Sequence, residues 1–187
     1  MRLDKPRIAP MTDAEMGPEQ KEALKDFGDG PLLNIFRTLA RAPKALSRFN
    51  AWGGYVLSRR NDLPAREREI VILRIGYLCR SGYEFTQHTR IGLQSGLSAE
   101  EIANIKRGAD VGWSPAEAAL IRAADELHND QFITDATWAE LRRHYSEKQC
   151  MDVVFTAGQY TQVSMMLNTF GVQLDAGQTL DPELKGY

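Results

Sequence analysis

The sequence predicts an all-α protein, built as one domain of about seven to nine helices. Apolar residues recur at helical spacing, and no stretch alternates apolar and polar residues long enough to predict a strand. Three segments begin with a capping box, a Ser followed three residues later by Glu or Gln: Ser98–Glu101, Ser114–Glu117 and Ser146–Gln149. A chain of 187 residues is long enough to bury a core.

Prolines and glycines divide the N-terminal part of the chain. Residues 1–17 have little periodicity, so we expect an extended arm there. A short helix is predicted from Pro18 to about Gly28, because proline suits the first turn of a helix and glycine the residue after its end. A turn at 28–30 and a second helix over 31–40 follow.

Two longer helices come next. The first is predicted from about Lys44 to Arg59, and Gly53–Gly54 in its middle is typical of a close packing contact. The second begins at 61–64 and continues to about Cys79. The three capped helices follow, and residues 176–187 are predicted to form a surface tail, so the helical domain spans 18–175.

Composition excludes several classes of function. Lys and Arg total 23 and Asp and Glu 25, a net charge of −2 that provides no general attraction to nucleic acid or anionic membranes. Cys79 and Cys150 are the only cysteines, too few for a disulfide framework or a cysteine-based zinc site. The start of the chain resembles no targeting sequence, and the most apolar stretch, 151–174, holds too many polar groups for a membrane span. We therefore expect a cytoplasmic protein without nucleic-acid or membrane partners. The stretch 151–174 suits a core helix or a subunit interface.

The most informative segment is a helix predicted from Ser81 or Gly82 toward Ser95. Ser81, Glu84 and His88 fall within an arc of about 60° on one of its faces. Glu84 and His88 are four residues apart, so their side chains can touch. A carboxylate beside an imidazole raises its pKa and fixes its orientation, as in a general acid or base; a solvated surface ion pair is the structural alternative.

The preceding helix carries two further candidates. Glu69 reaches the same cleft if the two helices pack antiparallel, and Arg74 is predicted either to neutralise a substrate carboxylate or to pair with a neighbouring Glu. Glu69, Glu84 and His88 are competent metal ligands, but no second histidine lies nearby in sequence, so we expect neither a metal nor a cofactor.

Five other residues are candidates for a site or for the core. Tyr83 is predicted to hydrogen-bond a substrate or to pack in the core. His128 lies near a helix end, where the dipole favours protonated histidine, and either contacts substrate or has a structural role. Gln159 lines a pocket or joins an inter-helix network. Cys79 would point away from Glu84 and His88 on a continuous helix and is predicted to be an inert thiol, as is Cys150 in the core.

Four blocks of sequence resemble the carboxymuconolactone decarboxylase and AhpD-like alkylhydroperoxidase family: Leu63–Arg74, Tyr83–His88, Asp125–His128 and Gly158–Ser164. The resemblance extends roughly from Asn34 to Asp175. It implies a single AhpD-like helical domain, a small-molecule substrate and a homo-oligomer, either a dimer, a trimer or a hexamer.

The peroxidase branch of that family carries Glu, eleven residues, Cys, two residues, Cys, three residues and His. On this sequence the pattern falls on Glu69, Ser81, Glu84 and His88, so both redox cysteines are absent. The resemblance therefore favours a decarboxylase-like enzyme acting on a small carboxylic acid or lactone. His88 would be the acid or base, oriented by Glu84. Glu69 would relay or hold a proton, and Ser81 or Tyr83 would hydrogen-bond the substrate.

Two alternatives remain open. The first is AhpD-like alkylhydroperoxidase or peroxiredoxin activity, carried by Cys79. The second is a non-catalytic helical oligomer that binds a ligand, in which Glu84 and His88 are structural.

Overall fold

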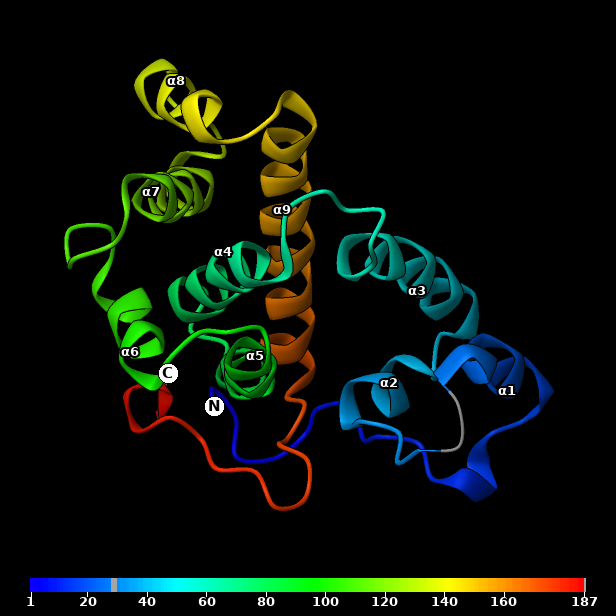
Figure 1. Ribbon diagram of the computed structural model, residues 1–187. Coiled ribbons are helices and arrows are strands. Elements are labelled where there is room, and N and C mark those ends of the chain that lie inside the picture. The colour runs from blue at the N-terminus through cyan, green and yellow to red at the C-terminus, as the bar shows by residue number, and fades with distance from the viewer. Residues whose placement is uncertain (28–29, 187) are drawn as a thin grey trace.

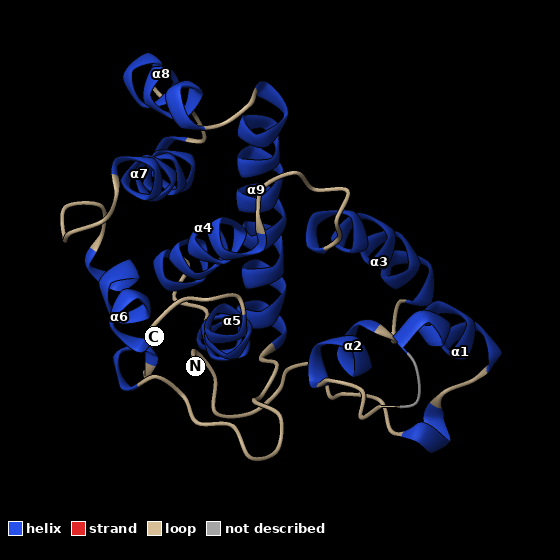
Figure 2. Ribbon diagram, in the orientation of Figure 1, coloured by secondary structure: helices blue, strands red, loops and turns tan. Residues whose placement is uncertain are grey.

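The computed structural model describes residues 1–27 and 30–186 and folds them into nine α-helices without any strand (Figures 1 and 2). The helices are α1 (Pro18–Leu24), α2 (Asn34–Leu39), α3 (Pro43–Leu57), α4 (Ala65–Leu78), α5 (Gly82–Gln94), α6 (Ala99–Arg107), α7 (Pro115–Asp130), α8 (Asp135–His144) and α9 (Glu147–Phe170). Short 3-10 helices lie at Asp13–Glu15, Lys25–Phe27 and Pro182–Leu184. The predicted all-α class and helix number are confirmed.

Helix α4 is the centre of the fold. It contacts α5, α6, α7 and α9, while α1, α2 and α3 lie together on the other side of α9 (Figure 1). Every residue from Glu69 to Gly76 is buried. A helix that is buried all round needs apolar residues on every face, and the Ile70–Leu73 run supplies them. Among the described residues, no helix has the length and apolarity that crossing a membrane requires.

The three predicted capping boxes are confirmed. The hydroxyls of Ser98, Ser114 and Ser146 accept hydrogen bonds from the backbone N–H groups three residues later, at 3.1, 3.3 and 3.1 Å. Each bond satisfies an N–H group that has no partner within its helix. The starts of α6, α7 and α9 are therefore encoded locally.

The second helix begins later than predicted. Helix α2 starts at Asn34, whose backbone N–H donates to Asp175 Oδ1 at 2.7 Å. Because a carboxylate from the far end of the chain caps this helix, spacing around Pro31 could not place its start. Gly28 and Asp29 lie outside the described residues, so the predicted turn at 28–30 cannot be compared.

The glycine pair in α3 has a different role from the one predicted. A Cβ atom at Gly54 would meet no atom within 4 Å, and one at Gly53 would meet only Gln159 Nε2, at 3.5 Å. The expected close packing contact is therefore wrong: Gly54 borders open space, and Gly53 allows only an ordinary contact with Gln159.

The two ends of the chain pack on the helical body. The N–H of Arg7 donates to the carbonyl of Phe170 at 2.8 Å, and the Met1 amino group to the carbonyl of Leu184 at 2.5 Å. Most of 176–186 is exposed, but Leu184 is buried. The segment predicted as a surface tail thus also contributes a side chain to the core.

Candidate functional site

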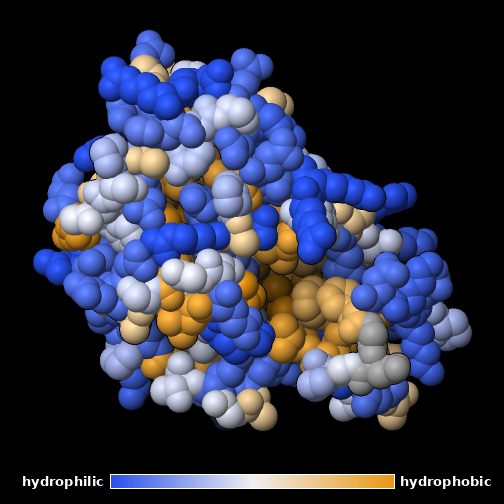
Figure 3. All heavy atoms as spheres, in the orientation of Figure 1, coloured by the Kyte–Doolittle hydropathy of each residue, from blue (hydrophilic) through white to orange (hydrophobic). Residues whose placement is uncertain are grey.

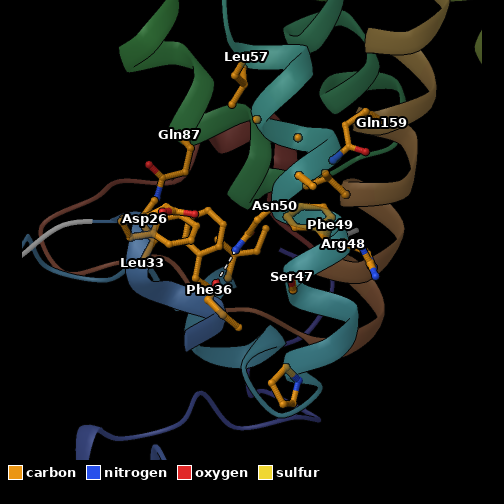
Figure 4. Close-up of a pocket in the computed structure, with 18 of the residues that line it drawn as sticks. Asp26, Leu33, Phe36, Ser47, Arg48, Phe49, Asn50, Leu57, Gln87 and Gln159 are labelled. Carbon is orange, nitrogen blue, oxygen red and sulfur yellow. Dashed lines mark hydrogen bonds between the residues drawn. The ribbon is translucent and has the colours of Figure 1, made fainter. Parts of the chain in front are cut away.

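A cavity of about 1320 Å³ lies between α1, α2 and α3 on one side and α5 and α9 on the other. Figure 3 shows its opening as a hollow lined with apolar side chains. Figure 4 shows Phe36 entering from α2, with Leu33 from the residue just before that helix, Phe49 from α3 and Gln159 from α9. Typical ligand pockets measure about 300–1,000 Å³, and this cavity exceeds that range. It therefore has more room than a single small-molecule ring requires.

His88 forms one wall of this cavity and is held between two carboxylates. Its Nδ1 lies 2.7 Å from Glu69 Oε2, and its Nε2 lies 3.0 Å from Glu84 Oε1. The first contact is a hydrogen bond; the second is an ion-pair contact in which Glu84 Oε1 accepts no hydrogen bond from any described residue. All three side chains are buried, so the predicted convergence of Glu69 with Glu84 and His88 is confirmed.

The two carboxylates determine the charge of the imidazole. Burial by itself lowers the pKa of His88, but the negative charges of Glu69 and Glu84 outweigh it and raise that pKa well above its ordinary value. The ring is therefore protonated at neutral pH, with one N–H fixed on Glu69. Such a group can donate a proton while the carboxylates hold its ring in place.

Glycines allow α4 and α5 to approach closely enough for this contact. A Cβ at Gly76 would lie 3.4 Å from Glu84 Cγ, and one at Gly92 would lie 3.2 Å from Leu73 Cδ1. Larger side chains at these positions would push the helices apart and separate Glu69 from His88. Our sequence interpretation overlooked both glycines, although a Gly within a helical pattern is a recognised sign of close packing.

Ser81 shares the face of α5 with Glu84 but does not line the cavity. It is the residue before the helix, and its hydroxyl is fully buried without a hydrogen-bond partner among the described residues. Tyr83 does line the cavity, yet its hydroxyl donates to Asp175 Oδ2 at 2.6 Å. Asp175 also accepts from Gln87 Nε2 at 2.6 Å. Sequence reasoning missed Asp175, because it joins groups that are distant in the chain.

Arg74 and His128 lie away from the cavity lining. Arg74 Nε donates to Asp125 Oδ1 at 2.5 Å, and its Nη1 donates to two carbonyls at the end of α6. Of its two predicted roles, the structure shows the ion pair, but the acidic partner is an Asp on α7 and not a Glu. Burial lowers the pKa of His128, so the expected stabilisation of its protonated form is wrong.

Neither thiol reaches the cavity. Cys79 ends α4, and its Sγ lies 3.6 Å from His128 Nδ1, while Cys150 is fully buried at the start of α9. Burial raises the pKa of both thiols, so both are protonated at neutral pH and poor nucleophiles. The chain is not continuous helix between Cys79 and Ser81, since Arg80 has a φ of 53°. Among the described residues, no group of three or more His, Cys, Asp and Glu side chains is arranged to hold a metal ion.

These observations agree with one protein family. Residues 43–126 match the carboxymuconolactone decarboxylase family. The predicted family resemblance is therefore confirmed. The match extends from α3 into α7 and includes Glu69, Glu84 and His88, whereas Gln159 lies outside it. No curated protein matches the sequence of this chain.

Solved structures share the fold at low sequence identity. An uncharacterized peroxidase-related protein with an alkylhydroperoxidase AhpD core, from Ralstonia eutropha JMP134, is 18% identical with a TM-score of 0.78, over 90% of this chain and 93% of that chain. A peroxidase-related protein from Silicibacter sp. TM1040 is 15% identical with a TM-score of 0.70, over 99% and 94%. The debrominase Bmp8, in complex with 2,3,4-tribromopyrrole, is 13% identical with a TM-score of 0.71, over 90% and 91%. These likenesses show that the chain has the AhpD-like helical fold. They do not identify a reaction.

Proposed function

We propose that the protein is an acid–base enzyme of the decarboxylase type, acting on an apolar carboxylic acid or lactone. The observation that carries the proposal is the Glu69–His88–Glu84 array at the wall of an apolar cavity that no thiol lines. Acid–base chemistry requires a positioned proton donor, and thiol peroxidase chemistry requires an accessible thiolate.

In this proposal, the bond that joins the carboxylate carbon to the rest of the substrate breaks, and carbon dioxide leaves. The electron pair of that bond moves into a neighbouring carbonyl group to form an enolate. The enolate carbon then takes a proton from His88, and the neutral imidazole recovers a proton from solvent while Glu69 holds its ring in place. An apolar cavity favours the step because the localised carboxylate charge is dispersed as the bond breaks.

Replacing His88 tests the proposal directly. His88→Gln keeps a polar side chain of similar length but cannot hold the proton, so carbon dioxide release or lactone turnover should fall by at least about 100-fold. His144→Gln is the matched control, because His144 is at the surface and contacts only Glu140 and the ring of Tyr145. Circular dichroism and urea unfolding check that both variants fold. Full turnover by a folded His88→Gln variant would contradict the proposal.

The peroxidase alternative has its own assay. We expect no reduction of hydroperoxide with excess dithiol, either by the wild type or by the double variant Cys79→Ser, Cys150→Ser. Turnover that disappears in the double variant would assign the chemistry to a thiol and overturn the roles proposed for Glu84 and His88. Ligand binding without turnover, unchanged in His88→Gln, would instead support the non-catalytic alternative.

The proposed homo-oligomer has a candidate surface on α9. Met151, Val154 and Met165 lie on this helix and are 45%, 37% and 58% exposed. Several exposed apolar side chains on one helix are typical of protein interfaces. Light scattering after size exclusion would measure the subunit number, and a monomer at micromolar concentration would contradict this part of the proposal.

A further inference from the structure

Helix α9 presents two adjacent polar side chains to the cavity whose polar ends form no hydrogen bond with the residues that the structure describes. Gln159 and Tyr160 are each only 4% exposed, and both line the cavity. Gln159 Oε1 is fully buried without a hydrogen bond, and the Tyr160 hydroxyl forms none with any described residue. Because buried polar groups are nearly always hydrogen-bonded, two unpaired neighbours in a cavity indicate a binding site.

Three donors of the cavity wall are already engaged, whereas Asn50 Oδ1 and Glu84 Oε1 accept no hydrogen bond from the described residues, and the cationic side chains of Lys44, Arg48 and Arg90 also line the cavity. The Tyr83 hydroxyl and Gln87 Nε2 donate to Asp175, and Asn50 Nδ2 donates to the Ala23 carbonyl at 3.0 Å. Donors that are satisfied within the protein contribute little to a ligand. The free donors on α9 are therefore Gln159 Nε2 and the Tyr160 hydroxyl.

Both donors border the cavity that His88 also lines. Figure 4 shows the Gln159 side chain extending from α9 toward α3, where Gly53 leaves room beside Nε2. The rings of Tyr160 and His88 meet edge to face, with centroids 4.8 Å apart. Burial, with the charges of Glu84 and Glu69, raises the pKa of Tyr160 well above its ordinary value, so its hydroxyl remains a donor.

We propose that Gln159 and Tyr160 form a carbonyl-binding site, in which Nε2 and the hydroxyl donate hydrogen bonds to a carbonyl oxygen of a ligand whose apolar body fills the cavity. This inference rests on the proposed function for its ligand class and assigns Tyr160 a contact with the substrate. In the reaction, the same donors would stabilise the negative charge that develops on the enolate oxygen. The ligand is selected by one hydrogen-bond acceptor and by apolar volume.

A matched pair of ligands isolates the carbonyl group. γ-Phenyl-γ-butyrolactone and 2-phenyltetrahydrofuran have the same ring and phenyl group, and only the lactone carries the carbonyl oxygen. Calorimetric titration of the wild type should show tighter binding of the lactone. Tyr160→Phe removes one donor and should reduce that preference by roughly three- to tenfold. Gln159→Met should reduce it similarly.

Tyr145→Phe is the control. Tyr145 is also nine-tenths buried, and it does not line the cavity, so its variant should keep the wild-type preference. Equal binding of the two ligands by the wild type, absence of lactone binding, or a preference that survives in Tyr160→Phe would each overturn the inference. Binding is measured at equilibrium, so a carbonyl preference without any turnover would support this site and contradict the proposed reaction.

Discussion

His88 Nδ1 lies 2.7 Å from Glu69 Oε2, although 19 residues separate the two in the chain. Glu69 is 1% exposed and His88 6%, so this contact is made without water. A charged pair in such surroundings is costly to separate, because either partner alone would be a buried and uncompensated charge. The contact between Glu69 and His88 can therefore be tested by replacing either partner.

Glu69→Gln should lower the pKa of His88. The substitution keeps the shape of the side chain and removes one of the two negative charges that raise this pKa, so the lowering effect of burial gains weight. An NMR titration of the imidazole C–H signals would measure the shift. Glu140→Gln is the control, because Glu140 contacts His144 and not His88. An unchanged His88 pKa in Glu69→Gln would contradict this account of the site.

The free energy of unfolding should fall with rising pH because of His88. Its pKa is about 6.5 when unfolded and higher when folded, so its contribution to stability is fully present below pH 6.5. Above that pH the folded state binds one more proton than the unfolded state, and stability decreases by up to about 1.4 kcal/mol per pH unit. Urea unfolding from pH 7 to 9 should show the decrease in the wild type and a smaller one in His88→Gln. Parallel curves would be inconsistent with a raised pKa.

Arg74→Met should destabilise the fold without weakening ligand binding. Arg74 connects α4 to Asp125 on α7 and to the carbonyls of Ile105 and Lys106. Its loss leaves these acceptors without a donor, at a cost of about 2–3 kcal/mol in urea unfolding. Arg122→Met, which breaks an exposed ion pair with Asp110, should cost less than about 1 kcal/mol. Loss of lactone binding in a folded Arg74→Met variant would instead give Arg74 its predicted substrate role.

Gly54→Ala should stabilise the protein. Gly54 lies inside α3, and the added methyl group would meet no atom within 4 Å. Alanine favours helix over glycine by about 0.8–1 kcal/mol, which urea unfolding can resolve. Gly171→Ala should have the opposite effect, because Gly171 has a φ of 69° and its Cβ would lie 2.9 Å from the Lys5 carbonyl. A Gly54→Ala variant less stable than wild type would mean that the cavity side of α3 is packed.

The sequence alone determined what depends on short spacing. The hydroxyl caps at Ser98, Ser114 and Ser146 and the Glu84–His88 pair involve residues three or four apart, and helix geometry fixes such contacts whatever surrounds them. The all-α class follows from the same periodicity. The absence of both cysteines of the peroxidase pattern could likewise be read directly from the sequence.

Tertiary structure decided the remaining features, because each depends on which distant group lies beside a buried one. Packing of α4 on α5 places Glu69 beside His88. The Tyr83 hydroxyl, which the sequence predicted as a possible substrate contact, donates a hydrogen bond to Asp175 instead. Burial made His128 neutral where the helix dipole alone favoured its charge. Local spacing records neither burial nor distant partners, so only the folded chain shows that Gln159 and Tyr160 remain unpaired beside the cavity.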